Sequence, residues 1–196
     1  MRAILDKLIS WTGLALVVVL LGAGGLLTWA STFIGDQVND QLTMQDITMP
    51  EGEALGGLSK ADVSALEQYA GSVLDSGPEA KAYADHYILA HMNSSSDGRT
   101  YQQVSSEFLA LDDEAKASEE GQALAGLRQS LFMGNTLRGL LLYGYAFATI
   151  GTIAGYAAIA AFVGAFVLLA LALLGMRHAH RTAQAEVAPR REPVTV

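Results

Sequence analysis

Two long stretches of this sequence, residues 11–30 and 139–175, contain no Asp, Glu, Lys or Arg. The whole chain is 51% hydrophobic and only 16% charged, and much of that apolar excess lies in these two stretches. A helix of a soluble protein usually keeps one polar face, whereas a helix surrounded by lipid is apolar on every face. The sequence therefore predicts an all-α membrane protein with two transmembrane helices.

The first span is expected at residues 11–30, after a short cytoplasmic N-terminus of residues 1–10. Trp11 and Trp29 bracket it and are predicted to anchor it at the two membrane surfaces. A narrow apolar stripe of Ile34, Val38 and Leu42 predicts that the helix continues to about residue 43. A cleaved signal peptide is the alternative, but the apolar run is long for one and no A-x-A-like site follows it.

The second apolar stretch is longer than a bilayer requires. From Gly139 to Met176 it has 38 residues, about 57 Å as a helix, against about 30 Å of hydrocarbon. A hairpin would leave its first leg too short and would place the C-terminal arginines outside. We therefore expect residues 155–175 to span, with Tyr156 at the outer interface and residues 138–154 extending outward.

The distribution of charge predicts the orientation. The two terminal segments carry six basic and three acidic side chains, whereas the rest of the chain carries six basic and 17 acidic ones. Because basic residues favour the cytoplasmic side, both termini are expected inside a bacterial plasma membrane, with the central domain outside. Arg177 and Arg181 are predicted interface anchors, and residues 176–196 a basic, disordered tail.

Residues 44–137 are expected to form a small, acidic, helical extracytoplasmic domain. Helix starts are indicated by Ser59 with Asp62, by Gly77 with Pro78, and by Thr100 with Gln103. One apolar face is predicted to run from Val63 to Val73, and another to include Tyr87 and His91. Residues 93–98 are expected to form a loop because of their Asn, Ser, Asp and Gly content, and no alternating pattern indicates a strand.

Small residues recur along the second long helix at spacings of three, four and seven. Small side chains let helix backbones approach closely, which drives association in lipid. Two interpretations stay open: packing of the two spans within one chain, and association with another chain. The predicted helix-packing residues are Gly144, Ala148, Gly151, Gly155, Ala158 and Ala165, with Gly22 and Gly25 on the first span beside Gly24.

The sequence offers little that points to chemistry. There is no cysteine, which excludes disulfides and thiolate sites. His86 and His91 are five apart, about 140° around a helix, so they are not expected to share a metal ion. We predict no catalytic, metal-binding or cofactor-binding residue, no cofactor and no nucleic-acid partner. Neither span contains an ionisable side chain, which argues against ion-coupled transport.

Several segments resemble a family of two-span actinobacterial membrane proteins that has no established function. The resemblance rests on Leu27, Thr28 and Trp29 with Phe33, on residues 80–88 with His91, on Thr100 and Tyr101 with Val104 and Ser105, and on residues 131–134 with 136–141. It covers about residues 20 to 175 and implies the two-span architecture and a bacterial origin. Members are often labelled aromatic ring-opening dioxygenases, enzymes that hold iron with histidines and a carboxylate; His86 and His91 do not supply that set.

We expect a non-enzymatic accessory, scaffold or assembly subunit that contacts membrane lipid and either itself or another membrane protein. The first alternative is an extracytoplasmic ligand-binding or sensor protein whose pocket is lined by Tyr69, Tyr83, Tyr87 and Tyr101. The second alternative is a metal-dependent enzyme.

Overall fold

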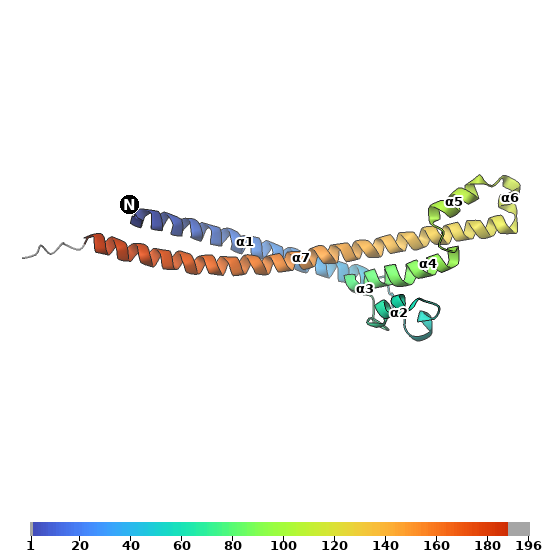
Figure 1. Ribbon diagram of the computed structural model, residues 1–196, viewed down its shortest axis with the longest axis horizontal. Coiled ribbons are helices and arrows are strands. Elements are labelled where there is room, and N and C mark those ends of the chain that lie inside the picture. Colours follow the sequence, from blue (N-terminus) through green and yellow to red (C-terminus); the bar gives the residue numbers. More distant parts are fainter. Residues whose placement is uncertain (1, 188–196) are drawn as a thin grey trace, which may run out of the picture. The chain divides into compact units, whose positions relative to one another are not determined.

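The computed structural model describes residues 2–187 and is built from helices (Figure 1). Within those residues there is no β-strand, and one isolated antiparallel bridge joins Thr48 to Val73. The predicted all-α fold is confirmed. In chain order the elements are α1 (Arg2–Thr43), the 3₁₀ turn η1 (Gly52–Leu55), α2 (Lys60–Glu67), α3 (Gly77–Ala82), the π-helical turn η2 (Tyr83–Ile88), α4 (Leu89–Ser96), α5 (Tyr101–Ala110), α6 (Asp113–Ala117) and α7 (Glu119–Val187).

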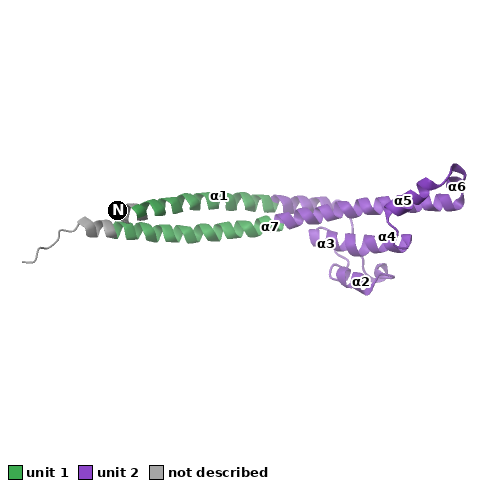
Figure 2. Cartoon of the chain, turned by 45° about the horizontal axis from the view of Figure 1, so that its top comes forward, with its two compact units in different colours: residues 1–32, 152–196 green, residues 33–151 purple. Residues whose placement is uncertain are grey.

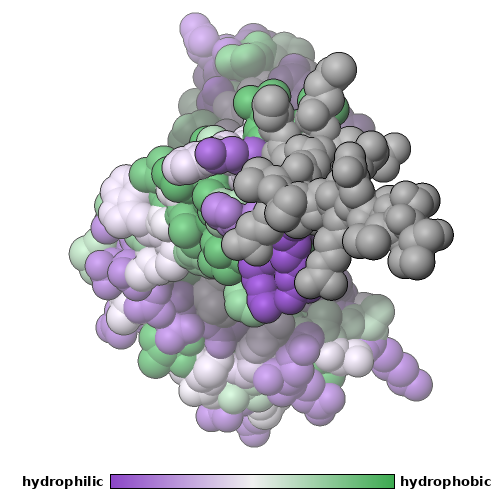
Figure 3. Space-filling view, turned by 90° about the vertical axis from the view of Figure 1, so that its left-hand side faces the viewer, coloured by the Kyte–Doolittle hydropathy of each residue, from purple (hydrophilic) through white to green (hydrophobic). Residues whose placement is uncertain are grey.

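Two of these helices are long and apolar enough to cross a membrane, within Lys7–Thr43 and Glu119–Arg181. Only 11% and 17% of their most apolar 18-residue stretches are buried inside the protein. A core helix of a soluble protein would be mostly buried. The end-on view of Figure 3 shows hydrophobic surface (green) exposed beside hydrophilic groups (purple), in keeping with the exposed Leu8, Ile9 and Trp11.

The chain divides into two compact units (Figure 2). Unit 1 contains α1 as far as Thr32 and α7 from Thr152 onward. Unit 2 contains residues 33–151, which are the end of α1, the start of α7 and every helix between them.

Unit 1 is an antiparallel pair of helices held together by small residues. A Cβ placed on Gly13 would lie 3.4 Å from the Cβ of Ala172, and one on Gly155 would lie 3.0 Å from the Oγ of Ser31. Contacts near the start of α1 thus involve the end of α7, and later contacts in α1 involve earlier residues of α7. Such close approach is possible only because one partner at each level lacks a large side chain.

The buried positions of this pair recur every seven residues on both helices. On α7 they are Ala158, Ala165, Ala172 and Ala179, all at most 7% exposed. On α1 they are Ser10, Val17 and Gly24. A strict seven-residue repeat keeps one seam facing the partner helix, as in a left-handed coiled coil.

Unit 2 has its core where the end of α1 and α7 meet the α2–α4 segment. Val38 and Leu42 from α1 and Leu141 from α7 are buried together, with Ile34 packed beside them. The predicted stripe at Ile34, Val38 and Leu42 therefore faces a core, as expected. From the central segment the core receives Met49, Leu66, Leu74, Ala80, Ala82 and Ala84.

The predicted helix starts are confirmed by their caps. The Ser59 side chain accepts from the backbone N–H of Asp62, and Thr100 and Gln103 form a reciprocal capping box. Pro78 lies in the first turn of α3. At that start, a Cβ on Gly77 would lie 2.4 Å from the Cβ of Ala148, so α3 packs directly on α7.

Two predicted boundaries in the central segment are wrong. The helix with Val63 and Leu66 ends at Glu67, because the chain turns at Gly71 with φ of +71°, and Val73 joins the bridge to Thr48 instead. The expected loop at residues 93–98 is shorter, since α4 continues to Ser96 and only Asp97 and Gly98 adopt left-handed φ. The hydroxyl of Ser95 donates to the backbone carbonyl of Met92 within α4, so this serine does not interrupt the helix.

The second long helix exceeds its predicted limits at both ends. It begins at Glu119, within the segment assigned to the outside domain, after a short turn that follows α6. It ends at Val187, so residues 176–187 are helical rather than part of a disordered tail. No Gly or Pro occurs between Met176 and Val187, and Pro189 is the first helix-breaking residue. Residues 188–196 of the predicted tail lie outside the described residues.

Candidate functional site

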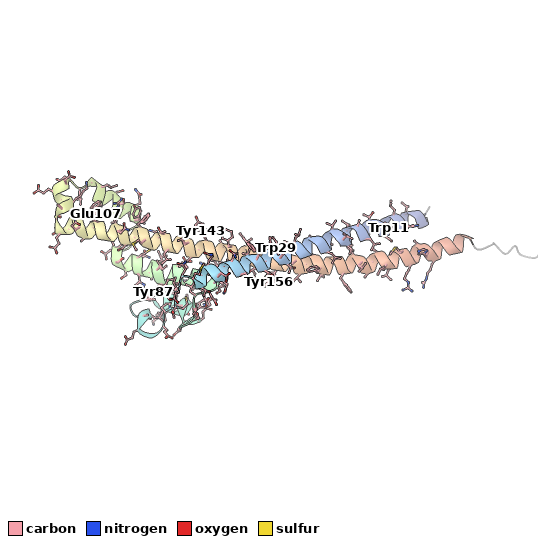
Figure 4. The ribbon with its side chains drawn as sticks, turned by 180° about the vertical axis from the view of Figure 1, so that it is seen from behind. Trp11, Trp29, Tyr87, Glu107, Tyr143 and Tyr156 are labelled. Carbon is pink, nitrogen blue, oxygen red and sulfur yellow. The ribbon has the colours of Figure 1, made fainter. Side chains whose placement is uncertain are left out.

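Two of the three predicted aromatic anchors of unit 1, Trp29 and Tyr156, lie at one level of the helix pair. Ser31, two residues after Trp29, lies against Gly155, which precedes Tyr156. Both aromatic rings are largely exposed, 65% for Trp29 and 70% for Tyr156, and Figure 4 shows them near one another. Two exposed aromatic side chains at the same height on adjacent helices are typical of a membrane–water boundary. At the other end of the pair, Trp11, Arg177 and Arg181 are also exposed.

The predicted helix-packing residues fall into two groups. Those of α7 face a neighbouring helix: Ala158 and Ala165 are 3% and 1% exposed, Gly151 is buried, and Gly155 lies opposite Ser31. In unit 2, Gly144 packs on Leu42 and Ala148 on Gly77.

Gly22 and Gly25 are exposed, with no atom within 4 Å of an added Cβ. In their place Gly24 packs on the ring of Phe162. The α7 small-residue stripe therefore serves packing within the chain, and a role of Gly22 and Gly25 at another chain stays a prediction.

A charged cluster joins η2 to α7 in unit 2. Arg138 donates from Nη2 to Asp85 Oδ1 at 2.8 Å and from Nε to the carbonyl of Ala84 at 3.2 Å, and Lys81 pairs with the other carboxylate oxygen of Asp85. The Ala84 carbonyl also accepts from the backbone N–H of Leu89, five residues on, so the π turn delivers it to Arg138. Burial alone would raise the pKa of Asp85, but hydrogen bonds from Lys81 and Arg138 outweigh it and lower that pKa.

Glu79 organises the loop before α3. It is only 7% exposed, and its carboxylate accepts from the hydroxyls of Ser72 and Ser76 and from the backbone N–H groups of Asp75 and Ser76. Burial would raise the pKa of Glu79, but these donors together lower it. For Asp75, burial and then the negative charge of Glu79 raise the pKa. Because all four of these donors belong to the loop that leads into α3 and to its cap, the Glu79 carboxylate is structural.

The two histidines of unit 2 have separate partners. His86 Nδ1 lies 2.9 Å from Asp62 Oδ1 on α2, whereas His91 Nδ1 lies 2.8 Å from the carbonyl of Tyr87. His91 is exposed rather than on the buried stripe, although its ring packs on Tyr87 with centroids 4.4 Å apart. Among residues 2–187, no three His, Asp or Glu side chains gather closely enough to hold a metal ion.

Unit 2 contains an apolar groove of about 570 Å³ between the end of α1 and α7. Its floor includes the core residues Val38, Leu42 and Leu141 with Gly144. Gln37 and Gln41 lie four residues apart along its α1 wall, and Gln45 lines it from the turn that follows α1. No carboxylate, ammonium or guanidinium group lines the groove, so it fits an apolar or uncharged occupant.

A row of exposed large side chains on α7 adjoins this groove. Leu140 and Phe147 form the α7 wall and are 61% and 56% exposed. Tyr143, labelled in Figure 4, is 67% exposed on the same helix. We call the row of Met133, Thr136, Leu140, Tyr143, Phe147 and Ile150 the outer stripe.

The four tyrosines predicted to line a pocket do not line this groove. Tyr83 and Tyr87 stack on each other at 4.9 Å and, like Tyr69, pack on the core of unit 2. Burial, and then Tyr87, raise the pKa of the Tyr83 phenol. Tyr101 packs against Phe132.

The groove and the outer stripe were not predicted from the sequence. A signal was present: the outer stripe repeats at three and four residues, as a coiled-coil seam does. It lies in an unbroken apolar run, where lipid-facing, core-facing and partner-facing residues look alike. No protein-family model, curated protein or solved structure matches this chain.

Proposed function

We propose that this protein is a membrane-anchored accessory or scaffold subunit, with both termini inside and unit 2 outside, that binds another polypeptide through unit 2. The observation that carries the proposal is the outer stripe with its groove. Contiguous exposed apolar surface of this kind marks interaction sites in proteins. The small residues of unit 1 pack against the other helix of the same chain. The outer stripe, rather than these small residues, is therefore the proposed contact with another polypeptide.

The membrane assignment is supported by both long helices and by the level of the aromatic residues. Trp29 and Tyr156 lie at one height, and the charge-free part of each helix extends from there toward Trp11 and Gly175. The actinobacterial two-span family that the sequence resembles has the same architecture. The orientation rests on the excess of basic side chains in the two terminal segments.

Purification in mild detergent followed by native mass spectrometry tests the proposal. We expect an assembly heavier than one 20.7-kDa chain. Replacing Leu140 and Phe147 together by Glu should release the single chain, because two buried carboxylates are not tolerated in an apolar contact. Ala146→Glu is the matched control, since Ala146 is exposed on the same helix but off the stripe. A wild-type protein that is strictly a single chain would overturn the proposal.

Binding of an apolar small molecule is a second candidate function, favoured by the volume of the groove. About 570 Å³ lies in the range of ligand pockets, roughly 300–1,000 Å³. The same spectra separate the two functions, because a small ligand would add only its own mass to one chain.

A further inference from the structure

The outer stripe has the spacing of a helix-pairing seam. Its residues follow one another at intervals of three, four, three, four and three, and all but Thr136 are large and apolar. The five large ones are each more than half exposed, from 53% for Ile150 to 67% for Tyr143. Side chains repeated in this way form the knobs that insert between residues of a facing helix.

Lipid is not a suitable cover for this stripe. Within unit 2, Leu42 of α1 lies against Gly144, and the two helices are antiparallel there. Asp36 and Asp40, which precede Leu42, are therefore at the level of the later part of the stripe, and both are exposed. Carboxylates at that level would be costly in hydrocarbon. A protein surface can cover α7 on one side while leaving Asp36 and Asp40 in water.

We propose that the outer stripe binds the outer stripe of a second copy of this chain, forming a parallel α7–α7 dimer; this rests on the proposed function and names its partner. Two copies inserted in one membrane with the same orientation present this stripe at the same height. A two-fold axis parallel to this part of α7 then places Leu140 opposite Leu140 and Phe147 opposite Phe147, as a self-complementary contact requires.

Charge and area support this partner. Outside the terminal segments the chain carries six basic and 17 acidic side chains, so most pairs of surfaces on two copies repel. The outer stripe carries no carboxylate, ammonium or guanidinium group, so two copies can meet there without that cost. Tyr143 and Phe147 belong to the aromatic class that buries roughly 150–250 Å² per side chain. Together with Met133, Leu140 and Ile150 they supply a large part of the roughly 800 Å² that each partner buries in a standard interface.

The groove adds the remaining contact. Leu140 and Phe147 belong both to the stripe and to the groove, whose opposite wall is Phe33 with Gln37 and Gln41 of α1. The α7 helix of the second copy, lying on the stripe, covers the mouth of this groove. The glutamine amides then lie at the rim of the interface, where they can bond to backbone carbonyls or water.

Single cysteines test the dimer cleanly, because the natural chain has none. Leu140→Cys and Phe147→Cys are oxidised in native membranes, with Ala146→Cys as the off-stripe control. All three positions are exposed, so none of the variants disturbs the core. We expect a covalent dimer as the main product for Leu140→Cys and Phe147→Cys, and several-fold less for Ala146→Cys.

A photo-reactive benzoylphenylalanine at position 147 identifies what faces the stripe. An adduct of twice the chain mass supports the second copy. An adduct with a different polypeptide, without disulfide dimers, overturns the dimer but leaves the proposed scaffold function standing. Disulfide yields that are equal at all three positions, or lipid adducts alone, also overturn the dimer, and lipid adducts alone count against the scaffold function as well.

Discussion

At the scale of single residues, unit 2 depends on two carboxylates, the buried Glu79 and the partly buried Asp85, that have different hydrogen-bond donors. Asp85 accepts from two cations, Lys81 and Arg138, whereas Glu79 accepts only from hydroxyls and backbone amides. Both arrangements favour the charged form over the neutral one, and both fasten the α3–η2 segment. Each can be tested separately because the two sites share no side chain.

Asp85→Asn should destabilise unit 2 by about 2 kcal/mol, because it weakens hydrogen bonds to two charged donors in a partly buried site. Asp85 and Arg138 are only 20% and 26% exposed. Glu107→Gln is the matched change at an arginine pair that is 38% and 54% exposed, and it should cost less than about 1 kcal/mol. Thermal unfolding of the purified protein, followed by circular dichroism, measures both. Equal losses would show that the Asp85 cluster has no special role.

Acid should weaken unit 2 through Glu79. Its ordinary pKa is 4.5 and the folded protein lowers it, so the unfolded chain binds the proton more tightly. The stability that Glu79 contributes is then complete above about pH 4.5 and is lost as the pH falls through the lowered pKa. Unfolding at a series of pH values should show this loss in the wild type and a flatter acid dependence in Glu79→Gln.

Asp75 provides the control for that experiment, since its raised pKa acts in the opposite direction. Its folded form binds the proton more tightly, so its contribution favours stability at low pH and is lost as the pH rises. Asp75→Asn should therefore keep the acid loss of stability or make it steeper. A flatter acid dependence in Asp75→Asn would contradict the assignment to Glu79.

At the scale of elements, the sequence was most informative where local chemistry decides the structure. Ser59, Pro78 and Thr100 mark helix starts because caps need only neighbouring residues. The end of α2 at Glu67 and the π turn over Tyr83–Ile88 were not predicted. They depend on distant partners, such as Thr48 for Val73 and Arg138 for the Ala84 carbonyl.

The pairing of α1 with α7 also depends on residues that are distant in the sequence. Gly22, Gly24 and Gly25 are equivalent in composition, and only the position of Phe162 distinguishes Gly24. The seven-residue repeat of buried alanines on α7 was visible in the sequence from Ala158 to Ala179. Ala158 and Ala165 were predicted as packing residues, whereas Ala172 and Ala179 were not, because alanine is abundant throughout this apolar run.

The α1–α7 pair should form a disulfide when Gly13 and Ala172 are both replaced by Cys. The two Cβ positions are 3.4 Å apart, close to the usual disulfide separation of roughly 3.5–4.5 Å. Adding Ala165→Leu should reduce the yield, because position 165 is 1% exposed and a large side chain there separates the helices. Gly22→Leu, at an open position, should leave the yield unchanged. Electrophoresis with and without reductant measures the bond.

At the scale of the whole molecule, the acidic side chains and the charge-free helical stretches occupy different parts of the chain. Seventeen of the 20 acidic side chains lie outside the two terminal segments, and neither predicted span contains one. We expect a chain with this division to insert into a membrane in one direction, because basic terminal segments resist transfer across it. The dimer depends on this, since only copies of like orientation present their outer stripes at one height.

A membrane-impermeant maleimide determines that orientation in the cysteine-free chain. Asp97→Cys, in the exposed turn after α4, should be labelled in intact cells, whereas Lys7→Cys should be labelled only after the membrane is permeabilised. The proposed topology also requires the label at position 7 to remain on a full-length chain, since removal of a signal peptide would take residue 7 away. Labelling of Lys7→Cys in intact cells would reverse the topology. Loss of residue 7 from the mature chain would remove the first span, and with it the anchor that holds two outer stripes at the same height.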